Sequence, residues 1–176
     1  MELARRYLGQ TVLGGLVVAI AACEPVTTNF VTSDYTAAAN VTYTWQVRYN
    51  KADGQDRPND TRLQQFASVS LENQNGVPPG LAVTGPDESG LWWPALPPKP
   101  TVDDVEARQQ ENERAEAPEL IKSVDYTLTV DQAGQQRTLP TSYDVYRQAV
   151  KAHGNQRPLE VILGPQDGSV INVNAQ

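Results

Sequence analysis

Seven prolines between residues 78 and 100 constrain the fold of this 176-residue chain more than any other feature. Proline fixes φ, lacks a backbone N–H and restricts the residue before it, so neither a helix nor a central strand can run through this segment. Residues 74–100 are therefore predicted to be irregular. Regular structure must lie on either side of them.

The segment before the prolines has the alternation that is typical of half-buried strands. In VTYTWQVRY, residues 41–49, apolar and aromatic side chains occupy one face and polar side chains the other. In QFASVSLEN, residues 65–73, Ala67, Val69 and Leu71 share a face. We expect these two strands to pair in antiparallel fashion across the loop KADGQDRPND.

The C-terminal third has the clearest pattern. Residues 124–130 alternate as a strand, the turn DQAG follows, and QQRTL returns as a second strand. Pro140-Thr141-Ser142 is a start signal for a helix that ends at His153-Gly154, with Gly154 suited to the left-handed position after the last turn. The helix face is expected to consist of Tyr143, Tyr146, Ala149 and Val150.

Two more strands, residues 159–163 and 170–174, flank the turn GPQDGS. The C-terminal unit therefore reads strand, strand, helix, strand, strand. This order predicts an α+β fold, with a small antiparallel or mixed sheet and one packed helix.

A second, polar helix is predicted from Thr101 to Ala117. Thr101 suits the N-cap, and Asp103 and Asp104 place negative charge in the first turn, where the helix dipole favours it. Pro118 would end the helix. Because this stretch contains few apolar residues, we expect the helix to be largely exposed to solvent or to a partner.

The N-terminus has the layout of an export signal. Arg5 and Arg6 precede an apolar run from Val12 to Cys23, and polar residues follow at once. The run has twelve residues, whereas a membrane-spanning helix needs about 20. A basic start, an apolar middle and small residues before a boundary favour a signal peptide over a membrane span.

Ile20-Ala21-Ala22-Cys23 resembles the lipobox of bacterial lipoproteins. The resemblance implies that residues 1–22 are removed and that Cys23 becomes the lipidated first residue, held in the membrane by two or more acyl chains. A plain cleaved signal with an incidental cysteine and an uncleaved anchor are the alternatives. Residues 23–40 are then predicted to be the lipidated N-terminus and a tether, and residues 41–176 a single domain.

Charge narrows the possible partners. The chain has 14 basic and 21 acidic residues, and loss of residues 1–22 removes Arg5, Arg6 and Glu2, which leaves 12 basic and 20 acidic residues and a net charge of −8. This acidity disfavours nucleic acid, which is bound by clustered Lys and Arg. It also disfavours adhesion to anionic lipid, so membrane attachment is expected through the lipid on Cys23.

Nothing in the sequence nominates a catalytic centre, and we expect no cofactor or metal. His153, the only histidine, lies at a predicted helix end, where the helix dipole and capping explain it. The serines lack a GxSxG-like elbow, and no His/Cys cluster has metal-binding spacing. Asp53, Asp56 and Asp60 form an oxygen-rich loop without the EF-hand pattern, so a solvated turn is favoured over calcium binding.

GLWWPALPPKP, residues 90–100, is the strongest candidate for binding. Adjacent tryptophans before stiff prolines suit recognition grooves and protein interfaces, because such a segment has little conformational entropy left to lose. The candidate partner-binding residues are Trp92, Trp93, Pro94, Pro97 and Pro98. The first alternative is that the segment folds back as a lid, with one tryptophan plugging the sheet and the other partly exposed. The second places the rings in the bilayer interface.

These features predict an envelope lipoprotein that faces the periplasm and acts, without catalysis, as a binding, assembly or accessory subunit of a membrane protein complex. The segment 90–100 and the polar helix are the expected docking surfaces for a protein partner. The alternative is an envelope hydrolase whose carboxylates the sequence does not identify. WWPALPPKPTVDD also resembles segments of cyanobacterial lipoproteins, which would make the membrane a thylakoid and the protein lumenal.

Overall fold

The computed structural model describes residues 28–52 and 61–176. The expected signal peptide 1–22, Cys23 and the loop aspartates Asp53, Asp56 and Asp60 lie outside these ranges. The described chain forms an eight-stranded mixed sheet with two helices. It is therefore an α+β fold in which β-structure predominates.

The strands follow the order β1-β7-β8-β6-β5-β2-β3, and β4 pairs with β2 beyond the end of β5. The sheet is mixed because β6 and β8 run parallel, whereas the other pairs are antiparallel. The elements are β1 (Asn29–Thr32), β2 (Tyr35–Lys51), β3 (Thr61–Gln74), α1 (Val102–Glu106), β4 (Glu113–Ala115), β5 (Glu119–Gln132), β6 (Gln135–Thr141), α2 (Tyr143–Gly154), β7 (Leu159–Leu163), a 3₁₀ turn (Pro165–Asp167) and β8 (Val170–Ala175).

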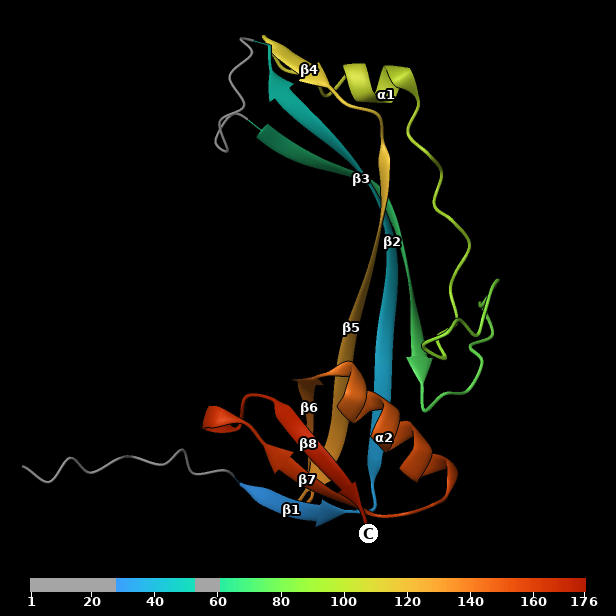
Figure 1. Ribbon diagram of the computed structural model, residues 1–176, viewed down its shortest axis with the longest axis vertical. Helices are drawn as coiled ribbons and strands as arrows, with labels where there is room; N and C mark the ends of the chain where they lie inside the picture. The colour runs from blue at the N-terminus through green and yellow to red at the C-terminus, as the bar shows by residue number, and fades with distance from the viewer. Residues whose placement is uncertain (1–27, 53–60) are drawn as a thin grey trace, which may run out of the picture.

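The molecule is elongated because β2, β3 and β5 continue as a ribbon beyond the rest of the sheet (Figure 1). β2 has 17 residues, and at about 3.3 Å per residue it spans about 55 Å. The strands β1, β6, β7 and β8 lie with α2 at one end of the ribbon. We call the other end, which carries α1 and β4, the distal end.

The predicted antiparallel pairing of residues 41–49 with 65–73 is confirmed. Val41 lies opposite Leu71 and Tyr43 opposite Val69. The register shifts between Thr44 and Gln46, so the ribbon has a bulge at its middle. A bulge of this kind bends the strand and increases its twist.

The predicted packed helix is also confirmed, as α2. Ser142 caps it by accepting a hydrogen bond from the N–H of Val145, and its buried face includes Tyr146 and Ala149. Tyr143 and Val150 are half-buried against the same core. One boundary differs from the prediction: Gly154 is the last helical residue, and the left-handed backbone falls at Gln156, with φ of 54°.

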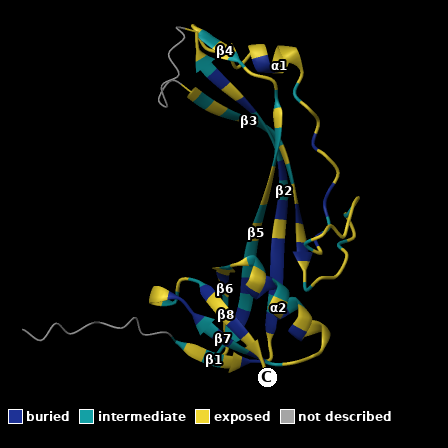
Figure 2. Ribbon diagram, viewed as in Figure 1, coloured by how far each residue is buried: buried dark blue, intermediate teal, exposed yellow. Residues whose placement is uncertain are grey.

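Buried side chains are concentrated at the α2 end and along β2 (Figure 2). The main core joins α2 to β2, β5, β7 and β8. A second, small cluster at the distal end contains Val47, Tyr49 and Val105, with Phe66 and Ala115 packed against it. The two ends of the ribbon therefore have separate cores of very different size.

The predicted tether over residues 23–40 is wrong from Asn29 onward. β1 pairs with β7, and residues 35–40 are the first part of β2. Ala37 and Ala39 are fully buried and belong to the main core. Alternation was hidden here because three consecutive alanines present an apolar side chain on both faces of the strand.

The polar helix predicted from Thr101 to Ala117 is also wrong in length. Its start is correct, because Thr101 and Asp104 form a reciprocal capping box, but α1 ends at Glu106. Asn112 then takes a left-handed conformation, and residues 113–115 form β4 beside β2. With few apolar residues to bury, the stretch gains more from strand pairing than from a longer helix.

Candidate functional site

Residues 90–100, which we call the proline strap, lie across one face of the ribbon formed by β2, β3 and β5. Trp93 is buried and packs on Tyr43, with ring centroids 4.9 Å apart. Trp92 is half-buried. The alternative in which the segment folds back as a lid, with one tryptophan against the sheet and the other partly exposed, is therefore confirmed.

A buried amide fastens the strap to β3. The side-chain oxygen of Asn73 accepts a hydrogen bond of 2.7 Å from the Trp92 N–H, and its amide nitrogen donates to the Trp92 carbonyl at 3.0 Å. Asn73 is only 1% exposed. A buried amide is stable when its polar atoms are satisfied in this way, so Asn73 fixes the strap in one register.

A carboxylate closes the turn that leads into the strap. One oxygen of Asp87 accepts from the backbone N–H groups of Ser89 and Leu91, and the other accepts from the ring N–H of Trp93 at 2.7 Å. Burial raises the pKa of Asp87, but these hydrogen bonds and the charge of Lys122 outweigh burial and bring the pKa below its ordinary value of 3.8. The turn therefore depends on an ionised Asp87.

The far half of the strap is held by Trp45 on β2. The ring N–H of Trp45 donates to the Pro97 carbonyl at 2.9 Å, and the Lys99 ammonium lies 5.5 Å from the centre of the Trp45 ring. Pro94 and Pro97 are buried, whereas Pro98 is exposed. Of the five predicted partner-binding residues, only Trp92 and Pro98 therefore present surface that a partner could reach without lifting the strap.

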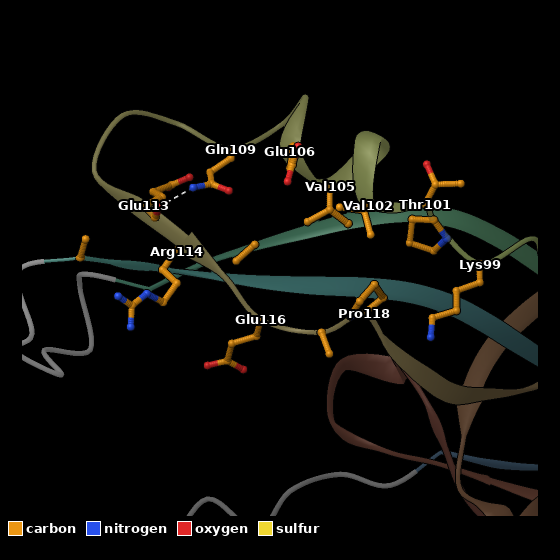
Figure 3. A pocket seen from close by; sticks show the side chains of 14 residues that line it. Lys99, Thr101, Val102, Val105, Glu106, Gln109, Glu113, Arg114, Glu116 and Pro118 are labelled. Atoms are coloured by element: carbon orange, nitrogen blue, oxygen red, sulfur yellow. Dashed lines mark hydrogen bonds between the residues drawn. The ribbon is translucent and has the colours of Figure 1, made fainter.

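An open groove lies where the strap meets α1 and β4 (Figure 3). It has a volume of about 700 Å³. Val102, Val105 and Pro118 supply apolar walls, and the side chains of Lys99 and Glu116 lie along its margin. Val102 is 71% exposed, so its side chain presents apolar surface along the groove.

Buried and ionic contacts hold the walls of the groove. The Tyr49 hydroxyl donates to the Val105 carbonyl at 2.8 Å, which ties α1 to β2. The Arg62 guanidinium forms a bidentate pair with Glu113 at 3.0 and 2.8 Å, which ties β4 to β3. The hydrogen bonds from Arg62 hold the pKa of Glu113 below its ordinary value of 4.5.

Two carboxylates of the groove already bind side chains of the protein. Glu113 is bound by Arg62, and Glu116 lies 3.7 Å from Arg48 and accepts a hydrogen bond from Asn50. A hydrolase would need a carboxylate pair free to meet a substrate. Within residues 28–52 and 61–176 there is also no cluster of His, Cys, Asp and Glu suited to a metal ion.

The groove could not be read from the sequence. Thr101 and its neighbours were expected in a long helix, in which Val102 and Pro118 would lie more than four turns apart. The only available signal was the scarcity of apolar residues between 107 and 117, which disfavours a long packed helix. His153 lies exposed in the last turn of α2, as expected, and is far from the groove in sequence and fold.

Among the described residues, no helix is both long enough and apolar enough to span a bilayer. Comparisons of the chain with protein families, with curated proteins and with solved structures found no match.

Proposed function

We propose that this protein is an envelope lipoprotein, anchored through Cys23, that acts without catalysis as a docking or accessory subunit of a membrane protein complex. The lipobox-like segment supports the anchor. The sheet begins at Asn29, six residues after Cys23, so the anchor would lie close to the end of the molecule that carries β1. If the cell is photosynthetic, the membrane is the thylakoid membrane and the domain is lumenal.

The distal groove is the observation that carries the docking proposal. It lies at the opposite end of the ribbon from β1, so β2 separates the anchor side from the groove by about 55 Å. That distance exceeds the thickness of a bilayer's hydrocarbon core, about 30 Å. With the ribbon upright on the anchored end, the groove would lie well away from the membrane surface.

The occupant that suits this groove is an extended segment of a protein partner. The groove is open, its apolar walls are flanked by Lys99, Arg114, Glu106 and Glu116, and its floor includes the short strand β4. An extended apolar segment with charges at its margins fits such a surface. This location coincides with the 101–117 docking region that the sequence suggested, although that region is not a long helix.

Replacement of Cys23 by Ser tests the anchor. We expect Cys23→Ser to move the protein from the membrane fraction to the soluble or unprocessed pool, because the thiol that carries the lipid is lost. Fractionation followed by immunoblotting measures this, and mass spectrometry of the wild-type N-terminus reports the acyl chains. Retention of Cys23→Ser in the membrane fraction would show that the anchor proposal is wrong.

Replacement of Val102 by Asp tests the groove. Val102 is exposed at the first position of α1, where a carboxylate favours the helix, so the fold should be kept while the apolar wall becomes charged. We expect partner recovery after cross-linking to fall about tenfold, as for loss of one interface anchor. Ile171→Asp, at an exposed apolar position on β8, is the matched control and should retain the partner. Equal recovery with Val102→Asp and wild type would exclude the groove as the docking surface.

A further inference from the structure

A second pocket lies between α2 and the start of the proline strap, away from the distal groove. Its volume is about 320 Å³, at the lower end of the range for small-molecule sites. Pro86 and the half-buried ring of Trp92 line one side, and Val150 of α2 lines the other. These side chains form an apolar slot of a size that suits a ring or a branched hydrocarbon group.

The polar groups around this slot are cations and donors. Arg147 and Lys151, one turn apart on α2, both line the pocket. One guanidinium nitrogen of Arg147 donates to the Tyr143 hydroxyl, and the remaining N–H groups are left for a ligand. Lys151 makes no side-chain hydrogen bond or ion pair within the described residues.

Tyr146 of α2 also contributes to the pocket wall. Its side chain lines the pocket, and its hydroxyl is the buried side-chain polar atom that lacks a hydrogen-bond partner among the described residues. Native structures rarely leave such a group unpaired, and each case calls for an explanation. This hydroxyl is buried, so the charged groups that a ligand in the pocket can reach are those of Arg147 and Lys151.

No carboxylate lines the pocket, although the chain as a whole has a net charge of −7. Asp87 and Glu88 lie in the strap turn but neither lines the pocket, and both oxygens of Asp87 already accept hydrogen bonds from Ser89, Leu91 and Trp93. The cations of α2 are therefore not neutralised by the lining of the pocket itself. A ligand carboxylate would supply the missing negative charge.

We propose that this pocket binds a small organic carboxylate with an aromatic or branched apolar body, which lies between Trp92 and Val150 while its carboxylate contacts Arg147 and Lys151. This assignment does not rest on the docking function, because the pocket and the distal groove share no lining residue. The same chemistry is present at the carboxyl end of a peptide that ends in phenylalanine. The small volume of the pocket, about 320 Å³, favours the free acid.

The test is a titration of the isotope-labelled protein, residues 23–176, with naphthalene-2-carboxylate, followed by the backbone and indole N–H resonances. We expect saturable shifts centred on Trp92 and α2, with a Kd of about 1 mM or lower for a ligand of this size. Naphthalene-2-carboxamide, which has the same shape without the charge, should bind about tenfold more weakly. The peptide Gly-Gly-Phe should bind more weakly than the free acid.

The double variant Arg147→Gln/Lys151→Gln should weaken binding of the carboxylate by about ten- to a hundredfold and leave binding of the carboxamide unchanged. Both positions lie outside the buried face of α2, so the fold should be kept. Lys99→Gln/Arg114→Gln removes two cations at the distal groove and is the matched control, with unchanged binding expected. Trp92→Ala should also abolish the shifts.

Four results would overturn the proposal: no saturable shift at about 10 mM ligand, equal binding of acid and amide, undiminished binding by the α2 double variant, or preference for Gly-Gly-Phe over the free acid. None of these results bears on the anchor or on the distal groove. Conversely, loss of partner recovery in Val102→Asp says nothing about this pocket. The two assignments therefore fail or hold independently.

Discussion

At the scale of single residues, two buried tyrosines show how a hydrogen bond determines whether a buried hydroxyl group stabilises the fold. Tyr49 and Tyr146 are both almost fully buried. The Tyr49 hydroxyl donates to the Val105 carbonyl, whereas the Tyr146 hydroxyl has no partner among the described residues. Burial of a hydroxyl without a hydrogen bond costs free energy, so the same chemical change should have different effects at the two positions.

We expect Tyr49→Phe to lower the free energy of unfolding by about 1 kcal/mol, because one buried hydrogen bond is lost. Tyr146→Phe should be neutral or stabilising, because it removes an unsatisfied polar atom without changing the shape of the ring. Urea denaturation of both variants measures the difference. Destabilisation of similar size in the two variants would show that the Tyr146 hydroxyl has a partner in solution.

Residue-scale chemistry was only partly visible in the sequence. The pattern of Val41, Tyr43 and Val69 predicted a strand pair because alternation is a local property. Asn73 gave no such signal: at the end of a strand it resembles an ordinary turn-former, and its partner Trp92 lies 19 residues away. Contacts of that kind depend on where the chain returns in space, which periodicity does not report.

At the scale of elements, the proline strap replaces regular secondary structure with a few strong attachments. It is held at Asn73, Asp87 and Trp45, and its prolines leave few backbone donors to satisfy. The sequence correctly excluded helix and strand here and offered the fold-back arrangement as an alternative. It could not decide between a docking strap and a lid, because both use the same aromatic and proline residues.

The Asp87 attachment should make the strap sensitive to acid. Because the folded-state pKa of Asp87 lies below its ordinary value of 3.8, the ionised form stabilises the fold at every pH above that value. This contribution declines as the pH falls below 3.8 and is lost once Asp87 is protonated in the folded state. We expect a red shift of tryptophan emission in this acid range as Trp93 becomes exposed.

Asp87→Asn should show the red-shifted emission already at neutral pH and should lack this part of the acid transition. The amide cannot supply a charged acceptor to the Trp93 ring N–H. Glu88→Gln, a neighbouring change on the same turn, is the control and should keep the wild-type transition. An acid transition that is identical in wild type and Asp87→Asn would show that another group controls the strap.

At the scale of the whole molecule, the sequence predicted the α2 end better than the distal end. The order of strands and helix after residue 123 was correct because each element there carries its own apolar face. Among the described residues of the distal end, only Val47, Tyr49 and Val105 are apolar and buried, and its other side-chain contacts include ionic and cation–aromatic pairs such as Arg108 over Phe66. Contacts of this kind produce no periodic pattern in the sequence.

The same imbalance predicts that the distal end opens at lower free energy than the α2 end. Small clusters with few buried apolar contacts form the low-stability units of a fold, whereas the main core opens only on global unfolding. Amides of β4 and α1 should therefore exchange hydrogen much faster than amides of β7 and β8. Native-state hydrogen exchange measures both sets in one experiment.

Two core variants test whether these are separate units. Leu159→Ala, in the main core, should lower the exchange free energy of β7 and β8 amides by about 2–5 kcal/mol. It should leave the exchange free energy of the distal amides unchanged, because the contacts of Leu159 are lost equally from the folded state and from the state in which only the distal end is open. Val47→Ala should lower the exchange free energy of both sets of amides, because wild-type Val47 stabilises the folded state relative to both the distal-open state and the unfolded state. Equal shifts of both sets in Leu159→Ala would mean that the ribbon unfolds as one cooperative unit, in which case the distal groove could not reshape around a partner while the α2 end stays folded.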